Sequence, residues 1–196
     1  AYTDTTYYAL LGMLSKSGLT KNDVNIQAAG PAGVWQQFAS KKAVGMAGVP
    51  DWTVSAMDAG AEVDILPADI YFKSMAQAIL ASDDTIQKNP QLIQNLVRAT
   101  LRGMKDIMSD PKAAAKVYVE HVPVHKGKEA SVLKTFELYN KYVYNAQKNL
   151  GQMDEARLAE LQSFYVSNGV VNKEVPVKEL YTCLLYTSDA ADDTPC

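Results

Sequence analysis

An acidic side chain and an indole stand next to each other at Asp51 and Trp52. An aspartate can accept hydrogen bonds from the amino groups of a nitrogen heterocycle, and an indole can stack on its ring. The same pair could instead form an ordinary helix start, with Asp51 as the cap and Trp52 packed in the core. The pattern therefore indicates either a heterocycle site or a helix terminus, and as a site it favours a neutral or cationic ring.

A second group of polar residues, Asp4, Thr5 and Thr6, precedes apolar residues that recur at helical spacing. The start of a helix exposes unpaired N–H groups and the positive end of the helix dipole, which together can bind an anion. The alternative is that Asp4 or Thr5 simply caps its own helix. Asp4 would repel an anion unless it points away, so this group argues against an anionic ligand.

The first 70 residues alternate between helix and strand patterns. Predicted helices near 5–17, 31–38 and 51–60 alternate with short predicted strands at 24–28, 43–49 and 63–66. Such alternation is typical of parallel strands with crossover helices, so we expect a small three-layer α/β lobe. Ligands bind at the carboxyl edge of such a sheet. The candidate ligand-binding residues at that edge are Asp4, Thr5, Thr6, Gly30, Gly33, Asp51, Trp52 and Tyr71.

After Tyr71 the pattern changes to helices. One more strand is predicted at 75–80, and Asn89-Pro90 and Asp110-Pro111 each place a capping residue before a proline. Further helices are predicted at 128–144 and 154–168. Their apolar faces need a sheet to cover, and a single strand is too little, so we expect an incomplete lobe over 71–182.

Several classes of function find no support in the sequence. The formal net charge is −3 and no apolar run is long enough to cross a membrane, which disfavours nucleic-acid binding and a membrane span. No nucleophile–base pair, phosphate loop or dinucleotide fingerprint occurs. His121 and His125 lack a carboxylate or cysteine cluster at metal spacing. We therefore expect a binding module without a cofactor or a metal, and not an enzyme.

The order of elements resembles the periplasmic substrate-binding proteins of ABC importers, and within them the nitrate/sulfonate/taurine and thiamine-pyrimidine-precursor group. Segments 4–10, 48–52, 74–79 and 89–111 carry this resemblance. It implies an α/β, type II periplasmic-binding-protein-like fold, in which 1–70 is the second lobe and 71–182 the returning part of the first. On this mapping the N-terminal part of the first lobe and a signal peptide lie upstream.

The same resemblance implies a monomeric periplasmic protein that closes two lobes around a small solute and then docks on a permease in the inner membrane. The expected ligand is a pyrimidine-like nitrogen heterocycle; sulfonate, taurine or nitrate is the alternative. The family's anion binders tend to have glycine and serine where this chain has Thr3 and Asp4. An enzyme like the thiamine-pyrimidine synthases is disfavoured, because their cysteine-rich motif has no counterpart in 1–182. A cytosolic ligand-sensing domain on the same scaffold is a further alternative.

The last 14 residues differ from the rest. Residues 183–193 resemble the reading-frame translation of a sequencing adapter, and both cysteines, Cys183 and Cys196, lie within 183–196. We therefore predict a non-native tail and draw no disulfide from it. Without the tail, the basic and acidic side chains are equal in number.

Overall fold

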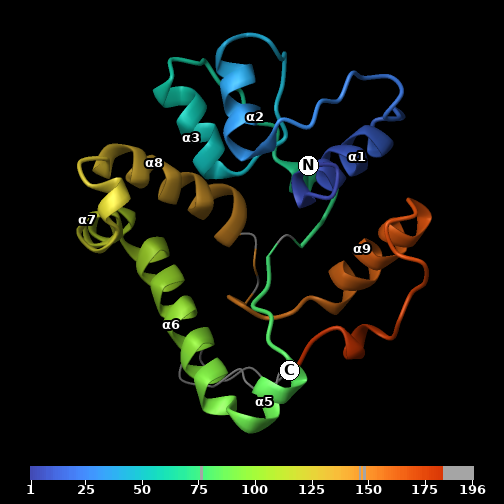
Figure 1. Cartoon of the computed structure of the whole chain (residues 1–196), viewed down its shortest axis with the longest axis vertical. Coiled ribbons are helices and arrows are strands. Elements are labelled where there is room, and N and C mark those ends of the chain that lie inside the picture. Colours follow the sequence, from blue (N-terminus) through green and yellow to red (C-terminus); the bar gives the residue numbers. More distant parts are fainter. Residues whose placement is uncertain (76, 146, 148, 183–196) are drawn as a thin grey trace.

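The computed structural model describes residues 1–75, 77–145, 147 and 149–182, which form helices joined by irregular segments (Figure 1). The predicted tail, 183–196, lies outside the described residues. The first half contains the helices α1 (Thr5–Lys16), α2 (Gly30–Ala39), α3 (Pro50–Asp58), α4 (Ala68–Tyr71) and α5 (Asp83–Lys88). The second half contains α6 (Pro90–Ser109), α7 (Pro111–His121), η1 (Pro123–His125), α8 (Glu129–Tyr139), η2 (Asn140–Tyr144), α9 (Glu155–Ser167) and η3 (Val177–Glu179).

The helix starts follow the capping signals of the sequence. The side chain of Asn89 accepts a hydrogen bond from the Leu92 N–H at 3.3 Å, and that of Asp110 accepts one from the Ala113 N–H at 2.9 Å. In both helices proline follows the cap, where its missing N–H has no cost. The predicted starts of α6 and α7 are thereby confirmed.

The predicted strands are not observed. Across the described ranges, the segments 24–28, 43–49, 63–66 and 75–80 (without residue 76) are neither helix nor strand. Backbone hydrogen bonds outside the helices are local turns and caps, so these segments do not pair with one another. Residues 61–66 nevertheless alternate between half-buried and exposed, as in an extended chain. The alternation therefore specifies an extended backbone, whereas a strand also needs a neighbouring strand to bond.

The core between α7 and α8 consists of small aliphatic side chains. Ala115, Val119 and Val132 are buried between α7 and α8, and Leu133 and Phe136 pack against them. We call the three buried residues the aliphatic cluster. Helix α3 packs on α8 and against α2, as Figure 1 shows, so helices from both sides of the predicted boundary at residue 70 are in contact.

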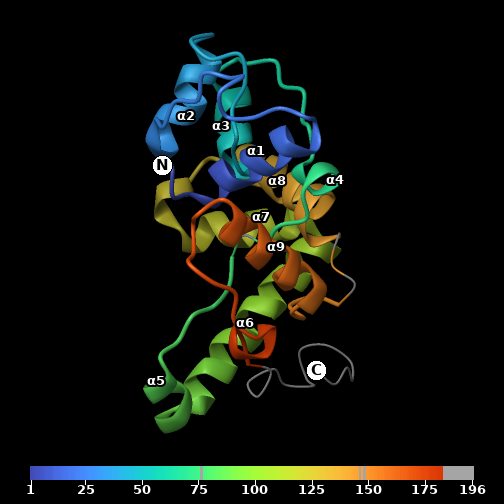
Figure 2. The same ribbon diagram turned by 90° about the vertical axis from the view of Figure 1, so that its right-hand side faces the viewer.

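The chain between α4 and α5 crosses from the upper helices to the lower ones, passing beside α9 (Figure 2). Phe72, on this crossing segment, is only 4% exposed, and its ring packs against Phe164 with centroids 4.5 Å apart. A side chain at Gly12 would collide with that ring, so glycine lets α1 approach the crossing segment closely. Phe72 thus joins α1 and α9.

Arg157 ties α9 to the crossing segment. Its Nη1 lies 2.9 Å from a carboxylate oxygen of Asp69 and donates to the Ser74 carbonyl oxygen at 3.2 Å. Both partners are more than 80 positions away in the sequence. A planar guanidinium can hold two acceptors in fixed directions, so this contact sets the position of α9.

Candidate ligand-binding site

Asp4 acts as the cap of α1. Its Oδ1 accepts hydrogen bonds from the backbone N–H of Thr6 at 2.9 Å and from the Thr6 hydroxyl at 2.7 Å. Both bonds stabilise the carboxylate and hold the pKa of Asp4 below its usual range. Of the two interpretations left open by the sequence, capping is the one that these bonds show. The Asp4 carboxylate already accepts the hydrogen bond of the Thr6 N–H, which is a group that could otherwise bind an anion at the helix start.

The two predicted glycines lie at the start of α2. Gly30 has a φ of 70°, in the left-handed region that favours glycine. A Cβ on Gly33 would lie 3.1 Å from the Ala29 side chain. Gly30 therefore has a backbone reason to be glycine, and at Gly33 a side chain would press against that of Ala29. Tyr71, another predicted site residue, ends the short helix α4.

Asp51 and Trp52 lie in the first turn of α3, where α3 meets α8. The Tyr139 hydroxyl donates to Asp51 at 3.4 Å, a long hydrogen bond. At the other end of α3, Asp58 accepts a bond from the Ser131 hydroxyl at 2.6 Å. In the described structure, the Asp51 side chain is thus hydrogen-bonded to a residue of α8.

Burial is the main cause that raises the pKa of Tyr139 to about 12, and the nearby Asp51 carboxylate adds to it. The Tyr139 ring also stacks on that of Tyr144, with centroids 5.5 Å apart. Tyr139 therefore remains a neutral hydrogen-bond donor over the physiological range of pH.

A tyrosine-lined cavity of about 520 Å³ lies beside α1, and we call it the tyrosine pocket. Its walls come from α1, from the loop after α1, and from the turn after α9. The residues that line it are Tyr2, Tyr7, Tyr8, Leu11, Ser15, Leu19, Thr20, Lys21, Asn22, Asn168, Gly169 and Val170.

The rings around this pocket form a continuous chain. Ring centroids are 5.2 Å apart from Tyr2 to Tyr7, 5.6 Å from Tyr7 to Tyr8, and 5.2 Å from Tyr8 to Tyr165 on α9. Burial, together with the neighbouring Tyr8, raises the pKa of Tyr165. Edge and tilted contacts of this kind leave ring faces available for a flat ligand.

Residues 1–114, more than half of the chain, match the NMT1/THI5-like family. This chain belongs to that family. Riboflavin-binding protein RibY of Chloroflexus aurantiacus is a curated relative, 27% identical over 181 residues, which cover 90% of this chain and 52% of the relative. The chain thus spans about half the length of that relative. The family predicted from the sequence is confirmed, and both matches support a solute-binding protein rather than an enzyme.

In this member of the NMT1/THI5-like family, none of the predicted site residues lines the tyrosine pocket. Tyr7 and Tyr8, which follow the predicted start of α1, both line it. The opposite wall, 168–170, was missed. Gly169, just past the end of α9, has a φ of 69°. No local pattern connects that turn with α1, because about 160 positions separate them.

The polar groups of the pocket are mostly uncharged. Thr20, Asn22 and Asn168 contribute hydroxyl and amide groups, and Lys21 is the charged residue of the lining. The Asn168 amide donates to the Phe164 carbonyl at 2.8 Å, which fixes the turn after α9. Aromatic walls with a few placed polar groups are typical of sites for small molecules.

The described part of the chain has neither a cluster of metal-ligating side chains nor a membrane-spanning helix. Over these residues, no group of three or more histidine, cysteine, aspartate or glutamate side chains could hold a metal ion. None of the described helices has the length and apolar character needed to cross a bilayer.

Proposed function

We propose that this chain is part of the solute-binding component of an ABC importer, and that it captures a flat nitrogen heterocycle in the tyrosine pocket. The observation that carries the proposal is the cavity of about 520 Å³ walled by the rings of Tyr2, Tyr7 and Tyr8. Its volume lies within the range of about 300–1,000 Å³ typical of ligand pockets. Lys21 and the side-chain amide of Asn22 can donate hydrogen bonds to ring nitrogens and carbonyls.

The relative's name adds a ligand class. Riboflavin has three fused rings, of which one is a pyrimidine-type ring, so it belongs to the same chemical class as the heterocycle expected from the sequence. Tyrosine faces stack well on such rings. We therefore take a flavin-type heterocycle as the first ligand to test.

Capture would follow the two-lobe mechanism of the family. In this proposal 1–70 and 71–182 belong to different α/β lobes, and the extended segments of the chain pair with strands from the rest of the protein. The tyrosine pocket has walls from both parts, since α1 precedes residue 70 and Asn168 follows it. A ligand that contacts both walls would select the closed form, which would then dock on an inner-membrane permease from the periplasm.

The alternatives have less support. An anion such as a sulfonate, taurine or nitrate would have to displace Asp4 from the Thr6 N–H. A synthase-like enzyme would need a cysteine-rich motif, and 1–182 contain no cysteine. The predicted edge residues Asp51 and Trp52 remain a second place for the heterocycle, because Asp51 is exposed beside the half-buried Trp52.

The deciding experiment titrates the full chain with riboflavin, an aminopyrimidine, taurine, an alkanesulfonate and nitrate, using ligand fluorescence or calorimetry. Riboflavin should bind, and Tyr8→Ala should weaken its binding about tenfold, since the loss of one ring contact is worth about 1 kcal/mol or more. The matched control is Tyr142→Ala, whose ring contacts Lys141 away from the pocket and should leave the affinity unchanged. Binding of a sulfonate alone would reject the proposal. Loss of binding in Asp51→Ala but not in Tyr8→Ala would move the site to α3.

A further inference from the structure

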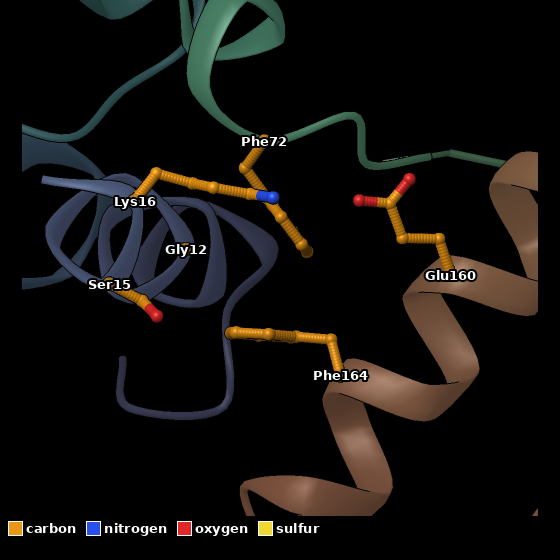
Figure 3. A pocket seen from close by; sticks show the side chains of 6 residues that line it. All are labelled: Gly12, Ser15, Lys16, Phe72, Glu160 and Phe164. Carbon is orange, nitrogen blue, oxygen red and sulfur yellow. The ribbon is translucent and has the colours of Figure 1, made fainter.

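Two walls of the tyrosine pocket are joined by ring packing, and the third is not. Figure 3 shows Phe72 and Phe164 projecting into the space between α1 and α9, and their ring centroids lie 4.5 Å apart. The third wall, residues 19–22, belongs to the loop between α1 and α2, in which residues 19–25 are all exposed. An exposed loop keeps one shape where hydrogen bonds fix its backbone, so the bonds within this loop decide how the third wall is presented.

A closed turn of four residues, 20–23, supplies those bonds. One carboxylate oxygen of Asp23, Oδ2, accepts hydrogen bonds from the Thr20 N–H at 2.8 Å and from the Thr20 hydroxyl at 2.7 Å. The Asp23 N–H donates to the Thr20 carbonyl oxygen at 3.1 Å, and the Asn22 N–H donates to the Thr20 hydroxyl oxygen at 3.2 Å. The two bonds from Thr20 hold the pKa of Asp23 below its usual range. An aspartate that bonds to nearby backbone in this way fixes the conformation of a turn.

The turn places hydrogen-bond donors at the pocket. Lys21 and Asn22, its two central residues, line the pocket, whereas Asp23 lies outside the lining. An ammonium has donors only, and a side-chain amide has two donors and one acceptor. The lining, as far as the described residues form it, contains no carboxylate. On the opposite wall, the Asn168 amide nitrogen already donates to a backbone carbonyl of α9, which leaves its oxygen to face a ligand. The turn is therefore the donor-rich side of the pocket.

We propose that Asp23 is a positioning residue: it holds Lys21 and Asn22 against the bound heterocycle, so that they select a ring edge of carbonyl oxygens over one that carries an amino group. This inference rests on the proposed function, because it concerns the same pocket. A carbonyl oxygen accepts a bond from either residue, whereas an amino group would set donor against donor and leave both without a partner. The preference is the reverse of the one expected at the second candidate place, where the Asp51 carboxylate would accept bonds from amino groups.

The test compares two fluorescent ligands on the full chain, lumazine and pterin. They share the same two fused rings and one carbonyl, and they differ at a single position, where lumazine has a second carbonyl and pterin an amino group. Lumazine should bind about tenfold more tightly than pterin. Lys21→Met keeps the aliphatic stem without the ammonium and should lower this ratio of affinities. Lys126→Met, at an exposed position after η1, is the matched control and should leave the ratio unchanged.

The same ratio tests Asp23 itself. Asp23→Ala opens the turn and should bring the ratio of lumazine to pterin affinity close to one. Asp23→Asn keeps a carbonyl oxygen that can accept the bonds from Thr20, and it should restore most of the preference. A merely structural role for Asp23 would weaken the binding of both ligands alike and leave the ratio unchanged. Asp64→Ala, which changes another exposed aspartate outside the helices, is the matched control.

The outcomes separate this inference from the proposed function. If riboflavin, lumazine and pterin all fail to bind, the proposed function fails and the inference fails with it. If riboflavin binds and the two smaller ligands bind equally, with no change of their ratio in Asp23→Ala, the heterocycle site stands and the role of Asp23 is rejected. Tighter binding of pterin than of lumazine would overturn the carbonyl preference, and loss of that binding in Asp51→Asn would place the ring at α3.

Discussion

The aliphatic cluster between α7 and α8 and the aromatic region between α1 and α9 are built in opposite ways. In the first, Ala115, Val119 and Val132 are between 2% and 6% exposed, and their small side chains fill the space between the helices. In the second, Tyr7 and Tyr8 are only half-buried and line a cavity. Aliphatic side chains complete their packing within the protein, whereas Tyr7 and Tyr8 keep part of their surface exposed.

Because of this difference, we expect the aliphatic cluster to contribute mainly to stability and the aromatic region mainly to ligand binding. Burial of branched aliphatic side chains stabilises the fold directly, at about 25 cal/mol per Å² of apolar surface. A ring that stays half exposed gives less stability, and a flat ligand can cover its remaining surface. Changes in the aliphatic cluster should therefore alter the free energy of unfolding, and changes in the aromatic region should alter affinity.

The largest effect is expected in the aliphatic cluster. Val132→Asp would place an unpaired carboxylate among apolar side chains and should lower the free energy of unfolding by about 3 kcal/mol or more. Val124→Asp is the matched control, since Val124 is 72% exposed and should change stability by less than about 0.5 kcal/mol. Urea denaturation followed by circular dichroism measures both. Equal losses in the two variants would show that the cluster is not the stabilising core.

An intermediate effect is expected at Arg157, where a substitution should alter both the free energy of unfolding and the ligand affinity. Lysine cannot hold Asp69 and Ser74 together, so Arg157→Lys should lower the free energy of unfolding by about 1–2 kcal/mol. It should also weaken ligand binding, because the turn after α9 forms one wall of the tyrosine pocket. Arg102→Lys, at an exposed position of α6, is the control. If Arg157→Lys lost stability but kept its full ligand affinity, the contact of Arg157 with Asp69 and Ser74 would not position the wall of the tyrosine pocket.

A smaller effect is expected at Asp4. Asp4→Ala removes the cap of α1 and should cost about 1 kcal/mol, whereas Asp4→Ser keeps a capping oxygen and should cost little. The folded state lowers the pKa of Asp4 from 3.8, so its charge stabilises the fold above that pH and less as the pH falls. The difference between the original chain and Asp4→Ala should therefore shrink in denaturation curves below pH 4. A ligand affinity that Asp4→Ser abolishes would show that Asp4 binds the ligand as well.

The smallest effect at neutral pH is expected at Tyr139. Its pKa rises from 10.0 to about 12 in the folded protein, so its contribution is complete below pH 10 and is lost as the pH rises toward 12. Tyr139→Phe should remove the tyrosine that ionises last in an ultraviolet titration, and Asp51→Asn should make that tyrosine ionise earlier. Tyr142→Phe is the control. An unchanged titration in Asp51→Asn would show that Asp51 does not raise the pKa of Tyr139.

The sequence predicted the helix boundaries well, because the signals for them are local. Asp4, Asn89 and Asp110 cap helices as expected, and Gly18, just past the end of α1, has the positive φ of 72° that is common after a helix C-terminus. The short helices α4 and α5 were missed, since four and six residues give no helical periodicity.

The strands could not be predicted in the same way. An alternating pattern such as 61–66 specifies an extended backbone, but pairing depends on a second segment that the pattern does not identify. The site was difficult for the same reason. The tyrosine pocket brings Tyr7 and Tyr8 together with Asn168 from the far end of the chain, and no local pattern identifies that partner.

The distance in sequence between Tyr8 and Tyr165 also sets the order in which the protein can mature. Helices α7 and α8 are neighbours in the chain, so the aliphatic cluster can form as soon as both have left the ribosome. The tyrosine pocket must wait for α9 and its following turn, which are synthesised last among the helices that build it. A chain interrupted before residue 165 could keep its aliphatic cluster and would have no binding site. Ligand binding therefore reports that synthesis has reached α9, which makes it a stricter test of an intact product than helix content.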